Sequence, residues 1–393
     1  MIRMENNTMK ALVLDAERRT ASVQSIPKPV AGENEVLVRV QYVALNPVDS
    51  LYVSEPLGKT GRTVGSDWAG TIIESNAGHL RPGTRVAGFL QGASSINERP
   101  GAFAEYLACP SDLLWTLPET MSLQEASTVS LCALTAAQAL FYRLQLPAPF
   151  PYSEQDIQTV AQGLAIRQTT AEQPLYFLIY GASTSVGMYA AQLVHHAAAS
   201  RGFRVVLIGT ASRARFPMLK SAPYSYHSLF DYKETDWPEK IRHATGGKGV
   251  DYVYDCIAEG LTVSSTSKLL KEGGRMAIVR SFEGGAFDTK HIVGNPIYGA
   301  VWEAFGVEVQ YYGMNLPASR PARAFATAFY KWLSKGQPLV PNPIRLMPGG
   351  LERIPLDGLI LLGGSNREDR LQNRDEEWMR QISAEKLVYK VGK

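Results

Sequence analysis

The fold of this chain is decided at one stretch, PLYFLIYGASTSVG at residues 174–187. Its first half is a continuous apolar run, which is typical of a buried strand. The small residues that follow predict a tight turn, and we expect a helix to begin near Val186 and to run through His195. A strand, a small-residue turn and a helix in this order bring the backbone close to a dinucleotide pyrophosphate, at the N-terminus of the helix.

The turn supplies the first candidate cofactor-binding residues. Backbone N–H groups and hydroxyls there are expected to meet phosphates, and the residues are Gly181, Ser183, Thr184, Ser185, Val186 and Gly187. Packing and helix capping are the alternatives. Glycines at such a turn also serve close packing, and hydroxyl side chains also cap helices, a role compatible with phosphate binding. The order of strand, turn, helix and second strand favours the cofactor site.

The sequence after the turn favours NADPH over NADH. No Asp or Glu occurs in residues 188–230, whereas the second expected strand, 203–208, is followed by Ser212 and Arg213. An NAD site uses a carboxylate here for the ribose 2′-hydroxyl, while an NADP site uses hydroxyls and a guanidinium for the 2′-phosphate. We therefore expect Ser212 and Arg213 at the 2′-phosphate, with Tyr232 against it or the adenine. A solvated surface charge is the alternative for Arg213.

Length and composition describe an ordinary two-domain protein. The chain has 393 residues, of which 45% are hydrophobic and 20% charged, and its net charge of +3 is too small to indicate a nucleic acid or a membrane surface. Its start is polar and no apolar stretch approaches the span of a bilayer, so we expect an intracellular, cytoplasmic protein. The three cysteines are far apart, which argues against a disulfide framework and a structural zinc site.

The β-strand signals of residues 9–110 are separated by turns rich in proline and glycine. A helical pattern over 121–140 follows, and Ser122 and Glu125 form the sequence of a capping box at its start. Further strands are expected near the C-terminus. The expected strands of these two regions are 9–14, 35–45, 67–73, 84–90, 339–347 and 386–391.

From Leu175 onward strands and helices alternate, which predicts a parallel, doubly wound sheet. A proline-rich insertion at 146–173 precedes it, and a short helix is expected at 153–166. The fold class is therefore α/β, with a dinucleotide domain inserted into a split β-rich domain and a substrate cleft between them. The expected strands are 175–180, 204–208, 228–231, 250–256, 275–279 and 307–312.

Five short motifs make the chain resemble the medium-chain dehydrogenase/reductase superfamily. They lie at residues 44–49, 65–70, 81–86, 101–106 and 383–388. The resemblance covers nearly the whole chain and implies a GroES-like β-rich domain plus a doubly wound Rossmann domain. The implied domains are the first part of the GroES-like catalytic domain at 9–140, the NADPH-binding Rossmann domain at 141–336, and the return to the catalytic domain at 337–393.

The zinc-dependent branch of that superfamily carries a Cys where Asn46 stands here, and a His-Glu pair where Ser66 and Asp67 stand. Neither is present, and the Cys-rich lobe of that branch is also missing. Asp49 and Asp67 are more easily interpreted as turn and packing residues than as metal ligands. The resemblance therefore implies a zinc-free reductase of the quinone oxidoreductase and enoyl reductase branch, with no metal site.

Within this branch the chain is most similar to the stand-alone enoyl reductases that serve fungal polyketide synthases in trans. The likeness is carried by hydroxyl residues 183–185, the proline-rich insertion, residues 210–212 and 230–232, and the segment 339–351. It implies hydride transfer from NADPH to the β-carbon of an α,β-unsaturated polyketide thioester on an acyl carrier protein, in secondary metabolism, by a monomer. One departure is Leu51, where members often carry a Lys.

The same resemblance indicates three candidate catalytic residues. Thr135 matches a family position near the nicotinamide, Asn46 lies at the cleft, and Tyr52 lies near the place where a proton must be given. The alternative for Thr135 is an ordinary helix residue, and that for Asn46 is turn formation with Pro47. The alternative to Tyr52 is a proton from solvent. Cys256 and Ile257 end the fourth expected strand beside the nicotinamide, although a small apolar filler is the alternative role for Cys256.

Two alternative functions stay open. An NADPH:quinone oxidoreductase would use the same cofactor site with a flat aromatic acceptor, and it would turn over simple quinones. A catalytically idle relative would act as a binding partner in a biosynthetic assembly, and it would fail to bind NADPH. The phosphate turn and the basic residues after the second strand argue against the idle relative.

Overall fold

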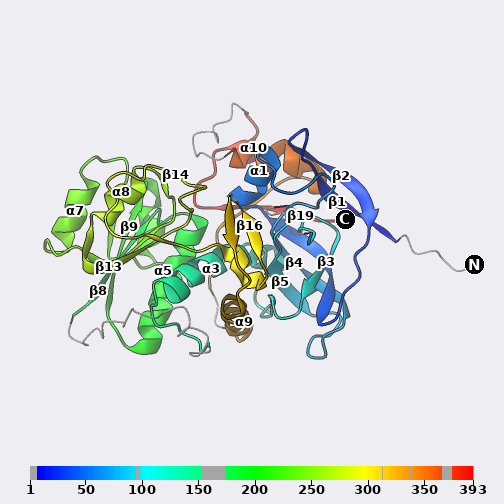
Figure 1. The fold of residues 1–393 in the computed structure, drawn as a ribbon, viewed down its shortest axis with the longest axis horizontal. Coiled ribbons are helices and arrows are strands. Elements are labelled where there is room, and N and C mark those ends of the chain that lie inside the picture. The colour runs from blue at the N-terminus through cyan, green and yellow to red at the C-terminus, as the bar shows by residue number, and fades with distance from the viewer. Residues whose placement is uncertain are drawn as a thin grey trace, which may run out of the picture. The chain divides into compact units, whose positions relative to one another are not determined.

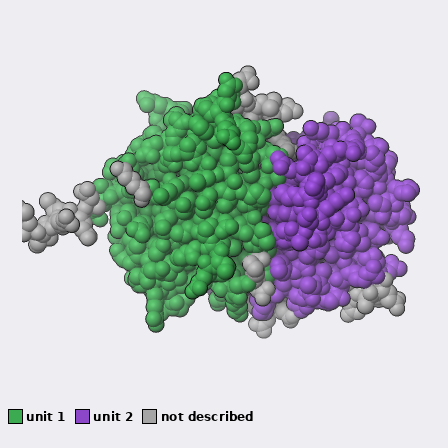
Figure 2. All heavy atoms as spheres, turned by 180° about the vertical axis from the view of Figure 1, so that it is seen from behind, with its two compact units in different colours: residues 1–131, 302–319, 329–393 green, residues 132–301, 320–328 purple. Residues whose placement is uncertain are grey.

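The computed structural model describes residues 7–93, 98–152, 173–311, 313–336, 339–364 and 374–392. The chain divides into two compact units, which Figure 2 shows in green and purple. Unit 1 contains Met1–Leu131, Trp302–Ser319 and Phe329–Lys393, and unit 2 contains Cys132–Val301 and Arg320–Ala328. The domain limits at 140 and 336 remain predictions beside these units.

Unit 1 is built on a mostly antiparallel sheet around β3 (Glu35–Ala44), whose apolar residues are largely buried. The strand order is β18-β19-β3-β4-β5-β7, and β6 also pairs with β3 (Figure 1). A separate hairpin is formed by β1 and β2. The bounds are β1 (Thr8–Asp15), β2 (Thr20–Pro27), β4 (Asp67–Ser75), β5 (Arg85–Phe89), β6 (Tyr106–Pro110), β7 (Leu114–Thr116), β18 (Ile344–Leu346) and β19 (Lys386–Lys390).

Most strands expected in the β-rich part are confirmed. The segments 9–14, 35–45, 67–73, 84–90 and 386–391 correspond to β1, β3, β4, β5 and β19. The segment expected at 339–347 is a strand only over Ile344–Leu346. Pro341 and Pro343 precede it and lack the N–H group that a strand ladder needs, so the strand begins after them.

The helical pattern of residues 121–140 is divided among three short elements. These are α2 (Leu123–Ala126), α3 (Ser130–Ala137) and a π-helical turn over Gln138–Arg143. The expected capping box is confirmed, because Glu125 N donates to Ser122 Oγ at 3.1 Å and Ser122 N donates to Glu125 Oε2 at 2.8 Å.

Unit 2 contains a parallel sheet of six strands in the order β10-β9-β8-β11-β13-β15. The chain winds outward from β8 in one direction and from β11 in the other. The two central strands therefore meet at the switch point of a doubly wound sheet, as predicted. The bounds are β8 (Leu175–Tyr180), β9 (Val205–Ala211), β10 (Ser228–Asp231), β11 (Val250–Asp255), β13 (Leu270–Ile278) and β15 (Ile297–Tyr298).

Alternate side chains of the central strand β8 serve both faces of this sheet. Leu178 and Tyr180 belong to an apolar cluster with side chains of α7 (Trp237–Ala244) and α8 (Thr262–Ser267). Successive strand residues point to opposite faces, so Phe177 and Ile179 face the other side. Both are fully buried. A parallel sheet covered on both faces accounts for the continuous apolar run at residues 175–180.

The expectation that 307–312 belongs to the parallel sheet is wrong. β16 (Val309–Tyr311) pairs antiparallel with β17 (Met314–Leu316), and Gly313 between them has a φ of 73°. A link this short allows a hairpin but not the crossover that a parallel strand needs. The sixth parallel strand is β15 instead. The helix expected at 153–166 lies outside the described residues, and among those described no helix has the length and apolar character to cross a membrane.

A buried ion pair joins two distant parts of unit 1. Lys386 begins β19 and Asp67 begins β4, and their Nζ and Oδ2 atoms lie 2.5 Å apart. Their side chains are only 2% and 0% exposed. Lys386 Nζ also donates to Thr128 O at 3.3 Å, so the ammonium is shared between a charged and a neutral acceptor.

We expect Lys386→Met to lower the free energy of unfolding by roughly 3–5 kcal/mol, because it leaves the Asp67 carboxylate buried without its cation. Chemical denaturation followed by fluorescence measures the change. Lys10→Met is the matched control, because its ion pair with Glu352 is more than half exposed and its loss should change little. Equal effects of the two substitutions would contradict a special role for the buried pair.

Candidate functional site

The turn after β8 leads directly into α5 (Ser185–Arg201). Thr184 is the residue that caps this helix. Its Oγ1 accepts a hydrogen bond from Gly187 N at 3.0 Å and donates one to Gly181 O at 2.8 Å. The neighbouring strand also holds the turn, since Gly181 N donates to Thr210 Oγ1 at 3.1 Å. The capping role is thus confirmed for Thr184, and it is compatible with phosphate binding at the helix N-terminus.

Two glycines keep this turn tight. Gly181 has a φ of 78°, in the left-handed region that favours glycine. A Cβ atom at Gly187 would lie 2.4 Å from Gly181 O, which is closer than any real contact. The backbone therefore folds back on itself where α5 begins. That arrangement is a cradle of the kind that accepts a pyrophosphate.

The loop after β11 lies against the same turn. Asp255 Oδ1 accepts hydrogen bonds from Ile257 N at 2.9 Å and Ala258 N at 2.8 Å, which fixes the loop. A Cβ atom at Gly181 would lie 2.8 Å from Ile257 Cγ1, so these two candidates are neighbours. Asp255 was not singled out from the sequence. Its position at the end of a strand, where aspartate often accepts from following N–H groups, is the signal that could have identified it.

Cys256 is buried beside the turn and is held by its backbone. Its N–H group donates to Tyr180 O at 3.0 Å. Burial raises the pKa of the Cys256 thiol well above its usual range. A protonated thiol in this place packs as a small apolar group and is a poor nucleophile. The role expected beside the nicotinamide stays a prediction for Cys256 and Ile257.

Arg213 follows β9, where a neighbouring strand brings two carboxylates. β10 pairs in parallel with β9, and Asp231 lies beside Ala211. Arg213 N donates to Asp231 Oδ2 at 3.4 Å, and the Arg213 guanidinium pairs with Glu234. Lys240 holds Glu234 from another direction at 2.6 Å. Residues 188–230 contain no Asp or Glu, but Arg213 still has carboxylates beside it. They come from the end of β10, which lies next to the end of β9.

The other candidates at the adenosine end lie in different surroundings. Ser212 is partly buried and precedes a 3₁₀ turn over Arg213–Arg215. Tyr232 is partly buried and packs against the apolar cluster of unit 2. The side chain of Arg213 is 73% exposed, so it can reach a ligand in solvent. The binding roles of these residues stay predictions.

The three candidate catalytic residues are divided between the units. Thr135 lies on α3 in unit 2 and is partly exposed. Asn46 precedes α1 (Pro47–Ser54) in unit 1, and Tyr52 lies on that helix; both are almost fully buried. Ser50 also fixes α1, since its Oγ is within hydrogen-bond distance of Leu359 O at 2.9 Å and Gly363 O at 2.7 Å.

A buried polar cluster surrounds the start of α1. It consists of Asn46, Asp49, Ser66, Asp67 and Lys386. Asn46 Nδ2 donates to Ser66 Oγ and to Asp67 Oδ2, both at 3.0 Å. Ser66 Oγ in turn donates to Asp49 Oδ1 at 2.8 Å. Asn46 is thus held by the turn and by this network, which supports a structural role for its amide without testing a role toward substrate.

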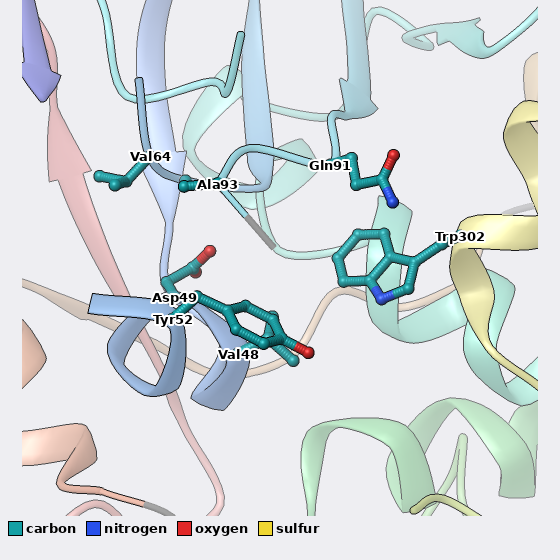
Figure 3. A pocket seen from close by; sticks show the side chains of 8 residues that line it. Val48, Asp49, Tyr52, Val64, Gln91, Ala93 and Trp302 are labelled. Carbon is teal, nitrogen blue, oxygen red and sulfur yellow. The ribbon is translucent and has the colours of Figure 1, made fainter. Parts of the chain in front are cut away.

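The polar cluster borders a pocket of unit 1. The pocket encloses about 210 Å³, including space open to solvent, and Asp49, Tyr52, Gln91 and Trp302 are among the residues that line it (Figure 3). Asp49 and Tyr52 project from α1, and Gln91 and Trp302 line the opposite part. Most of this volume is open to solvent and the enclosed part holds little more than a water molecule, so a substrate group would enter from the open side.

Gln91 and Trp302 were not predicted from the sequence, and no local pattern distinguishes them. Lys386 was part of a predicted motif but was assigned no role. Among the described residues no group of three or more His, Cys, Asp or Glu side chains is placed to hold a metal ion. The zinc-free character of the site remains a prediction.

Two family descriptions match the chain. "Alcohol dehydrogenase GroES-like domain" matches residues 32–119, and "Zinc-binding dehydrogenase" matches residues 185–298. The solved structure of an alcohol dehydrogenase superfamily protein from Novosphingobium aromaticivorans covers 98% of this chain and 100% of its own, with a TM-score of 0.69 and 18% identity. These findings confirm the α/β fold with a GroES-like domain and a Rossmann domain.

Two fungal proteins are similar to this chain over most of its length. The trans-enoyl reductase traG of Penicillium crustosum is 30% identical over 354 residues, which span 88% of this chain and 91% of that protein. The enoyl reductase cheB of Chaetomium globosum is 29% identical over 378 residues, which span 93% of this chain and 89% of that protein. The similarity therefore extends over nearly the whole length of this chain and of each fungal protein.

We expect Gly187→Ala to destabilise the chain by about 1–3 kcal/mol, because the new methyl group must displace the backbone at Gly181. Dinucleotide binding should weaken with it. Thermal unfolding and fluorescence titration measure the two effects. Gly78→Ala is the control, since a Cβ there meets nothing within 4 Å. Unchanged stability and binding in Gly187→Ala would show that the turn is looser than described.

Proposed function

We propose that this chain, which belongs to the medium-chain dehydrogenase/reductase superfamily as an enzyme of the enoyl reductase type, transfers hydride from NADPH to α,β-unsaturated polyketide thioesters. The substrate would be carried on the acyl carrier protein of a separate polyketide synthase. The similarity to proteins named trans-enoyl reductases supports the reaction. We expect the chain to work as a monomer in the cytoplasm.

One observation carries the proposal, namely the glycine cradle where β8 meets α5. The close approach of Gly187 to Gly181 and the capped start of α5 fit the pyrophosphate of a nicotinamide dinucleotide. The candidates that would hold the phosphates are Gly181, Ser183, Thr184, Ser185, Val186 and Gly187. When bound, the cofactor supplies the hydride.

The preference for NADPH would come from Ser212 and Arg213. Arg213 is paired with Glu234, so a 2′-phosphate must compete with one carboxylate. The competition favours the phosphate for two reasons. A phosphate monoester carries nearly two negative charges and binds guanidinium groups in a bidentate manner. Glu234 also keeps Lys240 as a partner at 2.6 Å, so it is not left unpaired when Arg213 turns to the ligand.

The pocket of unit 1 offers groups for the substrate end of the reaction. Negative charge gathers on the thioester oxygen as hydride reaches the β-carbon, and hydrogen-bond donors must meet it. Tyr52 and Gln91 carry such donors, and Trp302 provides an apolar wall for the acyl chain.

The reaction is tested by turnover of crotonyl-N-acetylcysteamine thioester, followed by NADPH oxidation. We expect reduction of the thioester, little turnover of a simple quinone, and binding of NADPH at least about tenfold tighter than of NADH, because a charge-assisted contact is lost with NADH. Faster turnover of the quinone would favour a quinone oxidoreductase. Failure to bind NADPH would favour a binding partner without catalysis.

Arg213→Ala should raise the Michaelis constant for NADPH about tenfold and leave that for NADH nearly unchanged, because only NADPH offers a phosphate to the guanidinium. Steady-state kinetics with both cofactors measure the split. Lys220→Ala is the control, since Lys220 is exposed on the same unit but lies at the end of α6 (Phe216–Lys220). An equal loss for both cofactors would indicate damage to the fold instead.

A further inference from the structure

Asp49 is a buried carboxyl group that lines the pocket of unit 1, and we propose that it gives the α-carbon of the substrate its proton. The role rests on the enoyl reductase function proposed above, since hydride addition leaves an enolate that must be protonated. The sequence suggested only a turn and packing role for Asp49. The structure supports that role and adds a second, because the same carboxyl that caps α1 also faces the pocket.

Two hydrogen bonds fix the Asp49 carboxyl. Asn46 N donates to Oδ2 at 2.7 Å, and Ser66 Oγ donates to Oδ1 at 2.8 Å. A carboxyl group has about four acceptor positions on its two oxygens, so these bonds leave room for a proton on the pocket side. The residue is 6% exposed. The group is therefore held in one orientation while keeping access to a ligand in the pocket.

The surroundings of Asp49 favour its protonated form near neutral pH. Burial raises the pKa of Asp49 from 3.8 to about 7, and the neighbouring Asp67 carboxylate adds to the increase. The Asn46 N–H, the Ser66 hydroxyl and the Lys386 ammonium act in the opposite direction. Asp67 begins β4 and Ser66 directly precedes it, Lys386 begins β19, and Asn46 precedes α1. A general acid works best when its pKa lies close to the working pH.

The neighbouring hydroxyls on α1 are less suited to this step. Ser50 Oγ is within hydrogen-bond distance of two backbone carbonyls, Leu359 O and Gly363 O, so its proton is used to tie α1 to α10 (Leu359–Leu362). Phenols are weaker acids than carboxylic acids, and the phenol of Tyr52 lines the same pocket as Asp49. Tyr52 is better suited to hold the thioester oxygen.

The proton transfer balances without any further reactant. The electron pair of the enolate forms a new C–H bond at the α-carbon, and the O–H bond of the Asp49 carboxyl breaks. The thioester carbonyl is restored in the same step. The Asp49 carboxylate then takes a proton from water before the next turnover.

The stereochemistry of the product tests this assignment. With 2-methylbut-2-enoyl-N-acetylcysteamine thioester the α-carbon becomes a stereocentre, which chiral chromatography resolves. We expect one configuration from the wild type and both from Asp49→Asn, because water then protonates either face of the enolate. Asp49→Asn should also lower the turnover number by about 100-fold or more, as the loss of a general acid does.

The pH dependence of kcat/KM gives a second readout. In the wild type kcat/KM should fall as pH rises through about 7, because only the protonated Asp49 donates. Ser66→Ala removes a hydrogen bond that stabilises the carboxylate, so it should move this decline to higher pH. The decline should be absent in Asp49→Asn. Ser66→Ala keeps the test decisive if Asp49→Asn does not fold.

The two proposals fail in different ways. Absence of enoyl thioester reduction by the wild type would overturn the enoyl reductase function and this role with it. Normal reduction by the wild type, together with a single product configuration from Asp49→Asn and an unshifted pH profile in Ser66→Ala, would overturn only the role of Asp49. Mixed product from Asp49→Asn and a shifted profile in Ser66→Ala would support both.

Discussion

Unit 1 depends on the carboxylate of Asp67, which is fully buried and receives donors from three other segments. Asn46 Nδ2 reaches it from the end of β3, Leu131 N from α3, and Lys386 Nζ from β19. A buried charge is tolerated only when it is paired and hydrogen-bonded, so these segments must come together for any of them to be stable. Through its hydrogen bond from Asn46, the Asp67 carboxylate thus also holds the start of α1, which carries Asp49 and Tyr52 to the pocket.

The sequence predicted those parts of the fold that local patterns determine. The strands 175–180 and 228–231 and the helix that follows the turn lie where the sequence predicted them. The parallel sheet followed from the alternation of strands and helices. Residues 307–312 were assigned to the wrong sheet, because a short apolar run does not determine its pairing partner. The turn at Gly313 pairs β16 with β17 instead.

In the candidate site, too, the features set by consecutive residues could be predicted and those set by distant contacts could not. The turn at 181–187 could be predicted because its residues are consecutive and its chemistry is local. The ion pair between Asp67 and Lys386 could not, since its members are 319 positions apart. Glu234 was missed for a related reason: it meets Arg213 only because parallel pairing aligns the ends of β9 and β10. Contacts created by strand register have no signature in a single stretch of sequence.

Asp49 and Asp67 are two buried carboxyls of one cluster with different partners. Asp67 has an ammonium at 2.5 Å, while Asp49 is held by a hydroxyl and a backbone N–H. The raised pKa of Asp49 has a consequence for stability. Between about pH 4 and 7 the folded chain keeps a proton that the unfolded chain releases, so Asp49 contributes less and less to stability as pH rises through this range. A second cation beside Asp49 would remove this cost, but it would also keep the carboxyl ionised and unable to donate. The unequal pairing of the two groups is therefore consistent with a site that needs one fixed charge and one transferable proton.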